Sequence, residues 1–235
     1  MTHFVLVHGA WHDAWCWERV IPLLRGSGHS VATVNLPRQR DAGADIYAAT
    51  IERAVSTPAD TVVVAHSAAG LVAPLVAQRA RVAELVLVAG LMQIPGMSWI
   101  EQRAASGSQQ HTDFFLERES RILTDPNGAL VWRATDAADI FYNDCQPADA
   151  QLATQRLSPQ DLTIFTERAP TRETPLIPTR YVLCSRDRAV SREWATHTAR
   201  EQFNAHIEEI DASHSPFWSR PADLVAVLCN GRIQH

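Results

Sequence analysis

Six short runs, most of them apolar and rich in β-branched residues, recur along the chain and alternate with longer stretches of mixed polarity. Near-continuous apolarity, as in residues 85–88, is typical of a parallel strand covered on both faces. The predicted strands are residues 4–7, 31–34, 61–65, 85–88, 180–183 and 207–210.

The stretches between these runs have helical patterning and end at glycine or proline signals. The predicted helices are residues 15–25, 45–55, 68–81, 191–203 and 221–228. This alternation predicts an α/β fold with a mostly parallel six-stranded sheet flanked by helices. Pro74 lies inside the third predicted helix and predicts a bend there, because proline lacks the backbone donor.

The regular recurrence of predicted strands stops between residues 88 and 180, where the sequence has polar helical patterning and scattered aromatic residues. Long connections without structure of their own are uncommon in compact domains, so we expect several short helices here. We predict a single domain, with a core at 1–90 and 178–235 and a helical lid at 91–177, inserted before the last two strands and covering the carboxyl edge of the sheet.

The composition of the 235 residues is that of an ordinary globular protein, with 46% hydrophobic and 20% charged residues. A net charge of −5 and the lack of a Lys/Arg run argue against nucleic acid or an anionic membrane as partner. The sequence has no basic leader and no apolar run of membrane-spanning length, so we expect a cytoplasmic protein that acts on small neutral molecules.

The four cysteines are scattered without C-x-x-C spacing, which gives no indication of a metal site or redox pair. We expect buried free thiols and no metal or organic cofactor. Cys184 lies close to Asp187 in the sequence, but we assign it no catalytic role.

Ser67 follows the third predicted strand directly and precedes a helix, as the serine of a nucleophile elbow does. Such an elbow needs small residues two positions to either side, and here these are Ala65 and Ala69, where glycine is usual. Gly70 follows and can relieve some crowding. A serine that merely caps a helix at a strand-to-helix junction is the alternative.

A serine nucleophile needs a base, and the base needs an orienting carboxylate. His214 follows the last predicted strand and Asp187 the one before it, so a parallel sheet places both at the edge that holds Ser67. The chain order Ser, Asp, His is also that of such hydrolases. Asp211 is the competing acid, but it lies only three residues from His214 and would have to fold back.

Two backbone amides are candidate donors to an oxyanion. Ala68 begins the helix after the serine, and Ala10 follows the close turn that Gly9 permits. An ordinary β-turn is the alternative at Gly9. We expect a substrate pocket with apolar walls that is lined by Gly9, Trp11, Trp132 and Phe141. For the aromatic residues among them, packing in the core is the alternative.

Only one of the ten histidines has a strong catalytic case. His66 is expected to be structural, and His8 and His12 to hydrogen-bond the backbone near the Gly9 turn. The others lack ligand-like spacing and are expected at the surface or as helix caps. They are His3, His29, His111, His197, His206 and His235.

Taken together, these motifs resemble the α/β-hydrolase superfamily, in particular the small-lid branch of bacterial EstC-like esterases, pyrethroid-type carboxylesterases, plant methylesterases and hydroxynitrile lyases. The resemblance runs almost end to end. It is carried by residues 5–12 with Trp15 and Trp17, and by 65–67, 141–145, 181–187 and 214–217. The resemblance implies a Ser67, His214, Asp187 triad, with the amides of Ala10 and Ala68 as oxyanion donors. Ala69 departs from the family's usual glycine.

The resemblance implies a cofactor-free serine hydrolase that cleaves a small, largely apolar carboxylic ester or lactone through an acyl-enzyme on Ser67. It also makes a homodimer plausible. The lyases of this branch have a threonine at the position of Gly9 and a lysine at that of Ser215, which disfavours cyanide release here. A cofactor-independent oxygenase, another C–C lyase, or a ligand-binding sensor with a retained hydrolase fold are the alternatives.

Overall fold

The centre of the protein is a six-stranded sheet in the order β2-β1-β3-β4-β7-β8, in which every neighbouring pair is parallel. The computed structural model describes residues 1–169 and 177–230. All six predicted strands are confirmed to within one residue at each end. They are β1 His3–Val7, β2 Ser30–Val34, β3 Thr61–His66, β4 Glu84–Val88, β7 Thr179–Cys184 and β8 His206–Ile210.

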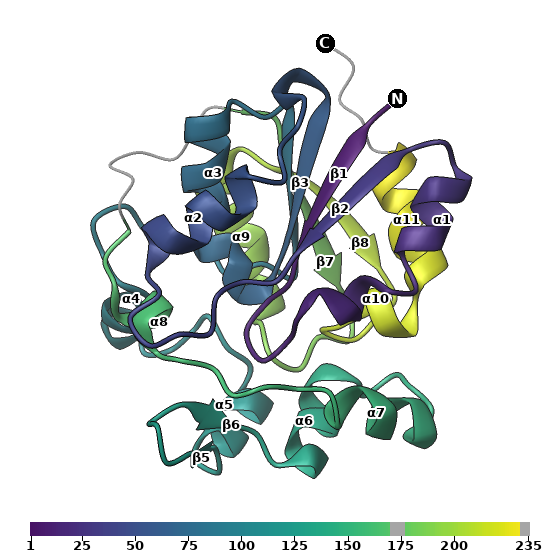
Figure 1. Ribbon diagram of the computed structural model, residues 1–235. Helices are drawn as coiled ribbons and strands as arrows, with labels where there is room; N and C mark the ends of the chain where they lie inside the picture. Colours follow the sequence, from purple (N-terminus) through teal and green to yellow (C-terminus); the bar gives the residue numbers. More distant parts are fainter. Residues whose placement is uncertain (170–176, 231–235) are drawn as a thin grey trace.

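Helices cover both faces of this sheet, as the prediction required (Figure 1). On one side lie α1 (Ile21–Gly26), α10 (Pro216–Ser219) and α11 (Pro221–Asn230). On the other lie α2 (Ala44–Glu52), α3 (Ala73–Ala80) and α9 (Arg192–Phe203). Strands β3, β4 and β7 are buried along their whole length, which explains their largely apolar pattern.

Two predicted helices are interrupted. Residues 15–25 form a 3-10 turn, η1 (Ala14–Trp17), before α1, and residues 68–81 form η3 (Ser67–Leu71) before α3. Another 3-10 turn, η2 (Pro58–Asp60), precedes β3. Pro74, which was predicted to bend the helix at 68–81 from within, instead lies in the first turn of α3, where its missing donor costs nothing.

The insertion between β4 and β7 holds short helices that form a cap, here defined as residues 91–169. Figure 1 shows α5, α6 and α7 beyond the carboxyl ends of the strands, with β5 and β6 beside them. The two-residue strands β5 and β6 pair antiparallel and are too short to leave a sequence pattern. The cap elements are α4 Trp99–Ala105, α5 Asp113–Glu119, β5 Leu123–Thr124, β6 Leu130–Val131, α6 Ala134–Phe141, α7 Pro147–Thr154 and α8 Thr163–Thr166.

Among the residues that the structure describes, one charged side chain is fully buried in the core. Arg180 of β7 donates to the carboxylates of Glu84 on β4 and Glu208 on β8, and to the carbonyl oxygens of Val227 and Leu228 on α11. This arginine therefore ties three strands to one covering helix, and its charge is balanced by two carboxylates.

No disulfide links the four cysteines, all of which lie in the described part of the chain. Cys16 and Cys184 are buried as expected, whereas Cys145 and Cys229 are half-buried. Among the helices of residues 1–169 and 177–230, none combines the length and apolar character needed to cross a bilayer.

Candidate active site

Ser67 occupies a strained turn between β3 and η3. Its φ is 50°, in the left-handed region that non-glycine residues rarely adopt, and only 9% of the residue is exposed. The backbone N–H of Leu91 donates to the Ser67 carbonyl oxygen at 2.9 Å and fixes the turn against the start of the cap. The geometry is that of the predicted nucleophile elbow.

Glycine is required beside this elbow at two positions other than 65 and 69. A Cβ on Gly70 would lie 2.3 Å from the carbonyl oxygen of Leu91, and one on Gly9 would lie 2.7 Å from the Cβ of Ser67. Ala65 and Ala69 are both buried in the core with their methyl groups in place. Alanine at position 69 is therefore compatible with the turn. Glycine is needed instead at position 70, where the backbone of Leu91 comes close.

His214 connects Ser67 to Asp187. The Ser67 hydroxyl lies 3.0 Å from Nε2 of His214, and Nδ1 of the same ring lies 2.9 Å from Oδ2 of Asp187. Because the carboxylate accepts a hydrogen bond from Nδ1–H, Nε2 carries no proton and can accept the one from the Ser67 hydroxyl. The three side chains come from the carboxyl ends of β3, β7 and β8, where the parallel topology was expected to bring them together.

The orientation of Asp187 is fixed by its own turn. Its Oδ1 accepts the backbone N–H groups of Ala189 at 2.7 Å and Val190 at 3.1 Å, which leaves Oδ2 for His214. The side chain is 7% exposed. The competing acid, Asp211, is 65% exposed and pairs with Arg186 instead, so it does not contact the His214 ring.

The backbone amides of Ala10 and Ala68 belong to two residues that line the same cavity as Ser67. Within residues 1–169 and 177–230, neither amide donates to a protein acceptor. An oxyanion formed at Ser67 would therefore meet donors that are not already engaged.

Two histidines hold the turn that carries Ala10, as predicted. His8 donates from Nδ1 to the carbonyl oxygen of Gly9 at 2.8 Å, and His12 donates from Nδ1 to that of Ala10 at 2.8 Å. Burial lowers the pKa of His8 to about 4 and that of His12 to about 3, so both rings are neutral. The Tyr142 hydroxyl in the cap donates to Nε2 of His12 at 2.7 Å and links the cap to this turn.

His66 has the structural role expected of it, and its partner is the candidate base. Its Nε2 donates to the backbone carbonyl oxygen of His214 at 2.9 Å, and the two rings lie 4.9 Å apart. Burial lowers the pKa of His66 well below its ordinary value. The neutral ring therefore positions the backbone of His214.

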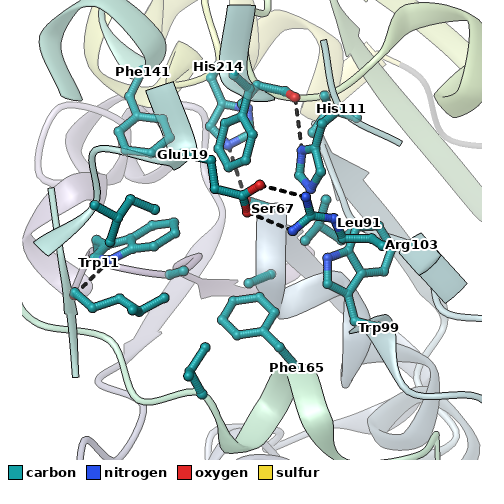
Figure 2. A pocket seen from close by; sticks show the side chains of 18 of the residues that line it. Trp11, Ser67, Leu91, Trp99, Arg103, His111, Glu119, Phe141, Phe165 and His214 are labelled. Atoms are coloured by element: carbon teal, nitrogen blue, oxygen red, sulfur yellow. Dashed lines mark hydrogen bonds and ion pairs between the residues drawn. The ribbon is translucent and has the colours of Figure 1, made fainter. Parts of the chain in front are cut away.

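A cavity of about 210 Å³ opens above Ser67 between the sheet edge and the cap. Figure 2 shows Trp11, Leu91, Trp99, Phe141 and Phe165 arranged around it. The cavity walls are thus largely aromatic and aliphatic, and they are supplied by both the core and the cap.

Two of the four predicted pocket residues, Trp11 and Phe141, line this cavity. The other two do not, and that part of the prediction was wrong. Gly9 packs beneath the Ser67 turn, and Trp132 lies behind the wall, 5.7 Å from the Trp11 ring and 5.8 Å from the Phe141 ring. Trp132 therefore supports the pocket wall without forming it.

The expectation that His111 is a surface or cap residue was also wrong. His111 is 9% exposed, stacks on Phe115 at 4.2 Å and lines the cavity. It lies in the irregular link between α4 and α5, where no periodic pattern indicates which side chains point inward. The sequence also gave no indication of Arg103 and Glu119, which line the cavity as well.

The remaining histidines are mostly peripheral. His197 and His206 are exposed, whereas His3 and His29 are half-buried. His235 lies outside the described residues. Among residues 1–169 and 177–230, no group of three His, Cys, Asp or Glu side chains is arranged to hold a metal ion.

Sequence and structure comparisons agree with this architecture. The alpha/beta hydrolase family profile matches residues 4–227. "Methyl jasmonate esterase 1" of Vitis vinifera is 28% identical over 96% of this chain and 95% of its own, and "Probable esterase PIR7A" of Oryza sativa subsp. indica is 26% identical over the same shares.

Solved structures share the fold. Polyneuridine aldehyde esterase superposes with a TM-score of 0.81 at 21% identity, covering 98% of both chains. A pyrethroid hydrolase from Sphingobium faniae JZ-2 superposes with a TM-score of 0.76 at 19% identity, covering 97% of this chain and 96% of that one. The chain belongs to the alpha/beta hydrolase family, as the resemblance predicted. Within that family it is an enzyme of the esterase type.

Proposed function

We propose that the enzyme hydrolyses a small, largely apolar carboxylic ester or lactone through an acyl-enzyme on Ser67. The observation that carries this proposal is the continuous series of hydrogen bonds from the Ser67 hydroxyl through His214 to Asp187, at the floor of an apolar cavity. The ester-hydrolysing relatives, among them a methyl jasmonate esterase, support the same reaction class.

In this mechanism the substrate carbonyl oxygen lies between the amides of Ala10 and Ala68. Ser67 attacks the carbonyl carbon while His214 takes the hydroxyl proton, and Asp187 stabilises the imidazolium that forms. The tetrahedral oxyanion collapses, the ester bond breaks, and His214 returns the proton to the departing alkoxide. Water then attacks the acyl-enzyme by the same steps and releases the acid.

The size and lining of the cavity limit the substrate. Its volume of about 210 Å³ is below the roughly 300–1,000 Å³ common for drug-sized ligands. Trp11, Phe141 and Phe165 favour an apolar acyl or alcohol group. A short or singly ringed ester therefore fits this proposal better than a long-chain lipid.

The lyase alternative finds little support at the site. Ser215 is fully buried next to His214, at the position where the hydroxynitrile lyases have a lysine. Arg103 is the one cation among the described cavity-lining residues apart from the histidines, and it is paired with Glu119. The homodimer and the cytoplasmic location remain predictions.

Replacement of the nucleophile tests the proposal. Ser67→Ala should lower turnover of a panel of p-nitrophenyl esters by roughly 10⁴-fold or more. A fluorophosphonate should label the wild type at Ser67, located by mass spectrometry, and leave the variant unlabelled. Ser185→Ala is the matched control, because Ser185 is an exposed serine at the same edge of the sheet. Equal turnover in Ser67→Ala and the control would refute the acyl-enzyme.

A further inference from the structure

Three polar side chains line the cavity in addition to Ser67 and His214. They are Arg103 near the end of α4, His111 in the link that follows, and Glu119 at the end of α5. All other described residues of the cavity wall are apolar or aromatic. Figure 2 shows the three together on the side of the cavity near Trp99. Polar groups concentrated in an otherwise apolar wall indicate a point of specific recognition.

Arg103 and Glu119 form a two-pronged ion pair. Each terminal guanidinium nitrogen lies 2.7 Å from one carboxylate oxygen, and the side chains are 20% and 32% exposed. This geometry leaves one N–H on each terminal nitrogen and a lone pair on each carboxylate oxygen for another partner. Because the pair is neutral as a whole, it favours a neutral polar group over a second carboxylate, which would compete with Glu119.

His111 adds an acceptor to this pair. Its Nδ1 donates to the carbonyl oxygen of Ala189 at 3.0 Å, which fixes the tautomer and leaves Nε2 as a bare acceptor. Among residues 1–169 and 177–230, the carbonyl oxygen of Ala189 is the one hydrogen-bond partner of the His111 ring. Burial, aided by the charge of Arg103, lowers the pKa of His111 to about 3, so the ring stays neutral. In Figure 2 the His111 ring points toward the Arg103 guanidinium.

We propose that Arg103, His111 and Glu119 form a polar subsite that binds a hydroxyl group of the substrate, remote from the ester that reacts at Ser67. A hydroxyl accepts from an Arg103 N–H and donates to His111 Nε2 or to Glu119, so it satisfies both kinds of group at once. A ketone accepts only, and leaves the histidine without a partner. This inference rests on the proposed ester hydrolysis and narrows the substrate class to hydroxylated apolar esters.

Paired substrates test the subsite. Methyl esters of straight-chain acids of increasing length are assayed with and without a terminal hydroxyl. At the chain length that spans from Ser67 to the subsite, the hydroxylated ester should have a kcat/KM roughly tenfold higher than its partner. In His111→Phe, which keeps an aromatic ring against Phe115, this ratio should fall toward one. In Arg121→Gln, which removes a solvent-exposed arginine just beyond the end of α5, the ratio should stay at the wild-type value.

A binding measurement separates this inference from the proposed function. In Ser67→Ala protein, calorimetry with the same ester pairs should show tighter binding of the hydroxylated member, and a second change, His111→Phe, should remove the difference. Equal kcat/KM within every pair, in an enzyme that hydrolyses the esters, would overturn the subsite and leave the proposed function standing. If no ester is hydrolysed, the proposed function fails, and equal affinities in the calorimeter then overturn the subsite as well.

Discussion

His214 and Asp187 meet through a single hydrogen bond of 2.9 Å between Nδ1 and Oδ2, while the second carboxylate oxygen of Asp187 is held by two backbone amides. An aspartate fixed in this way can hold the imidazole in one tautomer and one orientation throughout a reaction. Asp211, on the adjacent strand end, is engaged with Arg186 at the surface.

Replacing each aspartate in turn should therefore have very different effects on turnover. Asp187→Asn should lower kcat by about 10⁴-fold, because the amide favours the wrong tautomer of His214. Asp211→Asn should retain kcat within about twofold, because its exposed ion pair contributes little. Steady-state turnover of a p-nitrophenyl ester measures both. A larger defect in Asp211→Asn would reverse the assignment of the acid.

Gly9 predicts a packing effect on the elbow. A methyl group at this position would lie 2.7 Å from the Cβ of Ser67 and 2.8 Å from Nδ1 of His66. Gly9→Ala should therefore destabilise the protein by about 1–3 kcal/mol and lower turnover, because the serine or the histidine must move. Urea unfolding and ester turnover measure the two effects.

Gly26→Ala is the matched control for Gly9→Ala. A Cβ on Gly26, the last residue of α1, meets nothing within 4 Å, so this change should leave both stability and turnover close to the wild type. A Gly9→Ala protein as stable and active as the Gly26→Ala protein would mean that the turn has more room than the structure indicates.

The sheet could be predicted closely from the sequence, whereas the cavity could not. A run such as 61–65 must be a strand, because nearly every residue in it is apolar and β-branched, and the parallel order then places Ser67, Asp187 and His214 at one edge. The location of these three residues at one edge of the sheet follows from its topology. Pro74 was predicted inside a helix and lies in a first turn, because periodicity does not distinguish the first turn of a helix from its middle.

The residues that sequence reasoning missed lie in the cap. Arg103 and Glu119 resemble ordinary surface charges on short helices, and only the packing of α4 against the rest of the cap turns them toward the cavity. The assignment of Trp132 to the pocket was wrong because a large aromatic residue near a pocket is as often behind the wall as in it. Side-chain direction in short, irregular elements depends on tertiary contacts that periodicity does not encode.

The buried histidines predict how stability depends on pH. Burial lowers the pKa values of His8, His12 and His111 to between about 3 and about 4, from an ordinary value of 6.5. As the pH falls below 6.5, the unfolded chain binds protons that the folded protein excludes, so the free energy of unfolding decreases until the folded pKa values are reached. The loss approaches about 1.4 kcal/mol per pH unit for each such histidine.

Urea unfolding between about pH 7 and about pH 5 measures this slope, above the range in which most carboxylates titrate. His111→Phe should reduce the slope by one histidine's share, whereas His206→Gln, which changes an exposed histidine, should leave it as in the wild type. A free energy of unfolding that stays constant over this range would contradict the burial of neutral rings.

Arg180 predicts the largest effect on stability. Its guanidinium is fully buried against Glu84, whose side chain is 7% exposed, and against Glu208, which is 20% exposed. Arg180→Met keeps much of the apolar stem but leaves the Glu84 carboxylate buried without its cation, so unfolding should become easier by about 3–5 kcal/mol. Arg192→Gln removes an exposed ion pair with Glu209 and should cost at most about 1 kcal/mol.

A double variant distinguishes the charge from the packing. If the loss in Arg180→Met comes from the uncompensated carboxylate, then adding Glu84→Gln, which removes that charge while keeping the shape, should recover part of the stability. Chemical unfolding of the two single variants and the double variant gives the coupling energy between the residues. Strictly additive losses would show that Arg180 acts through its packing and its bonds to α11, and that the ion pair contributes nothing of its own.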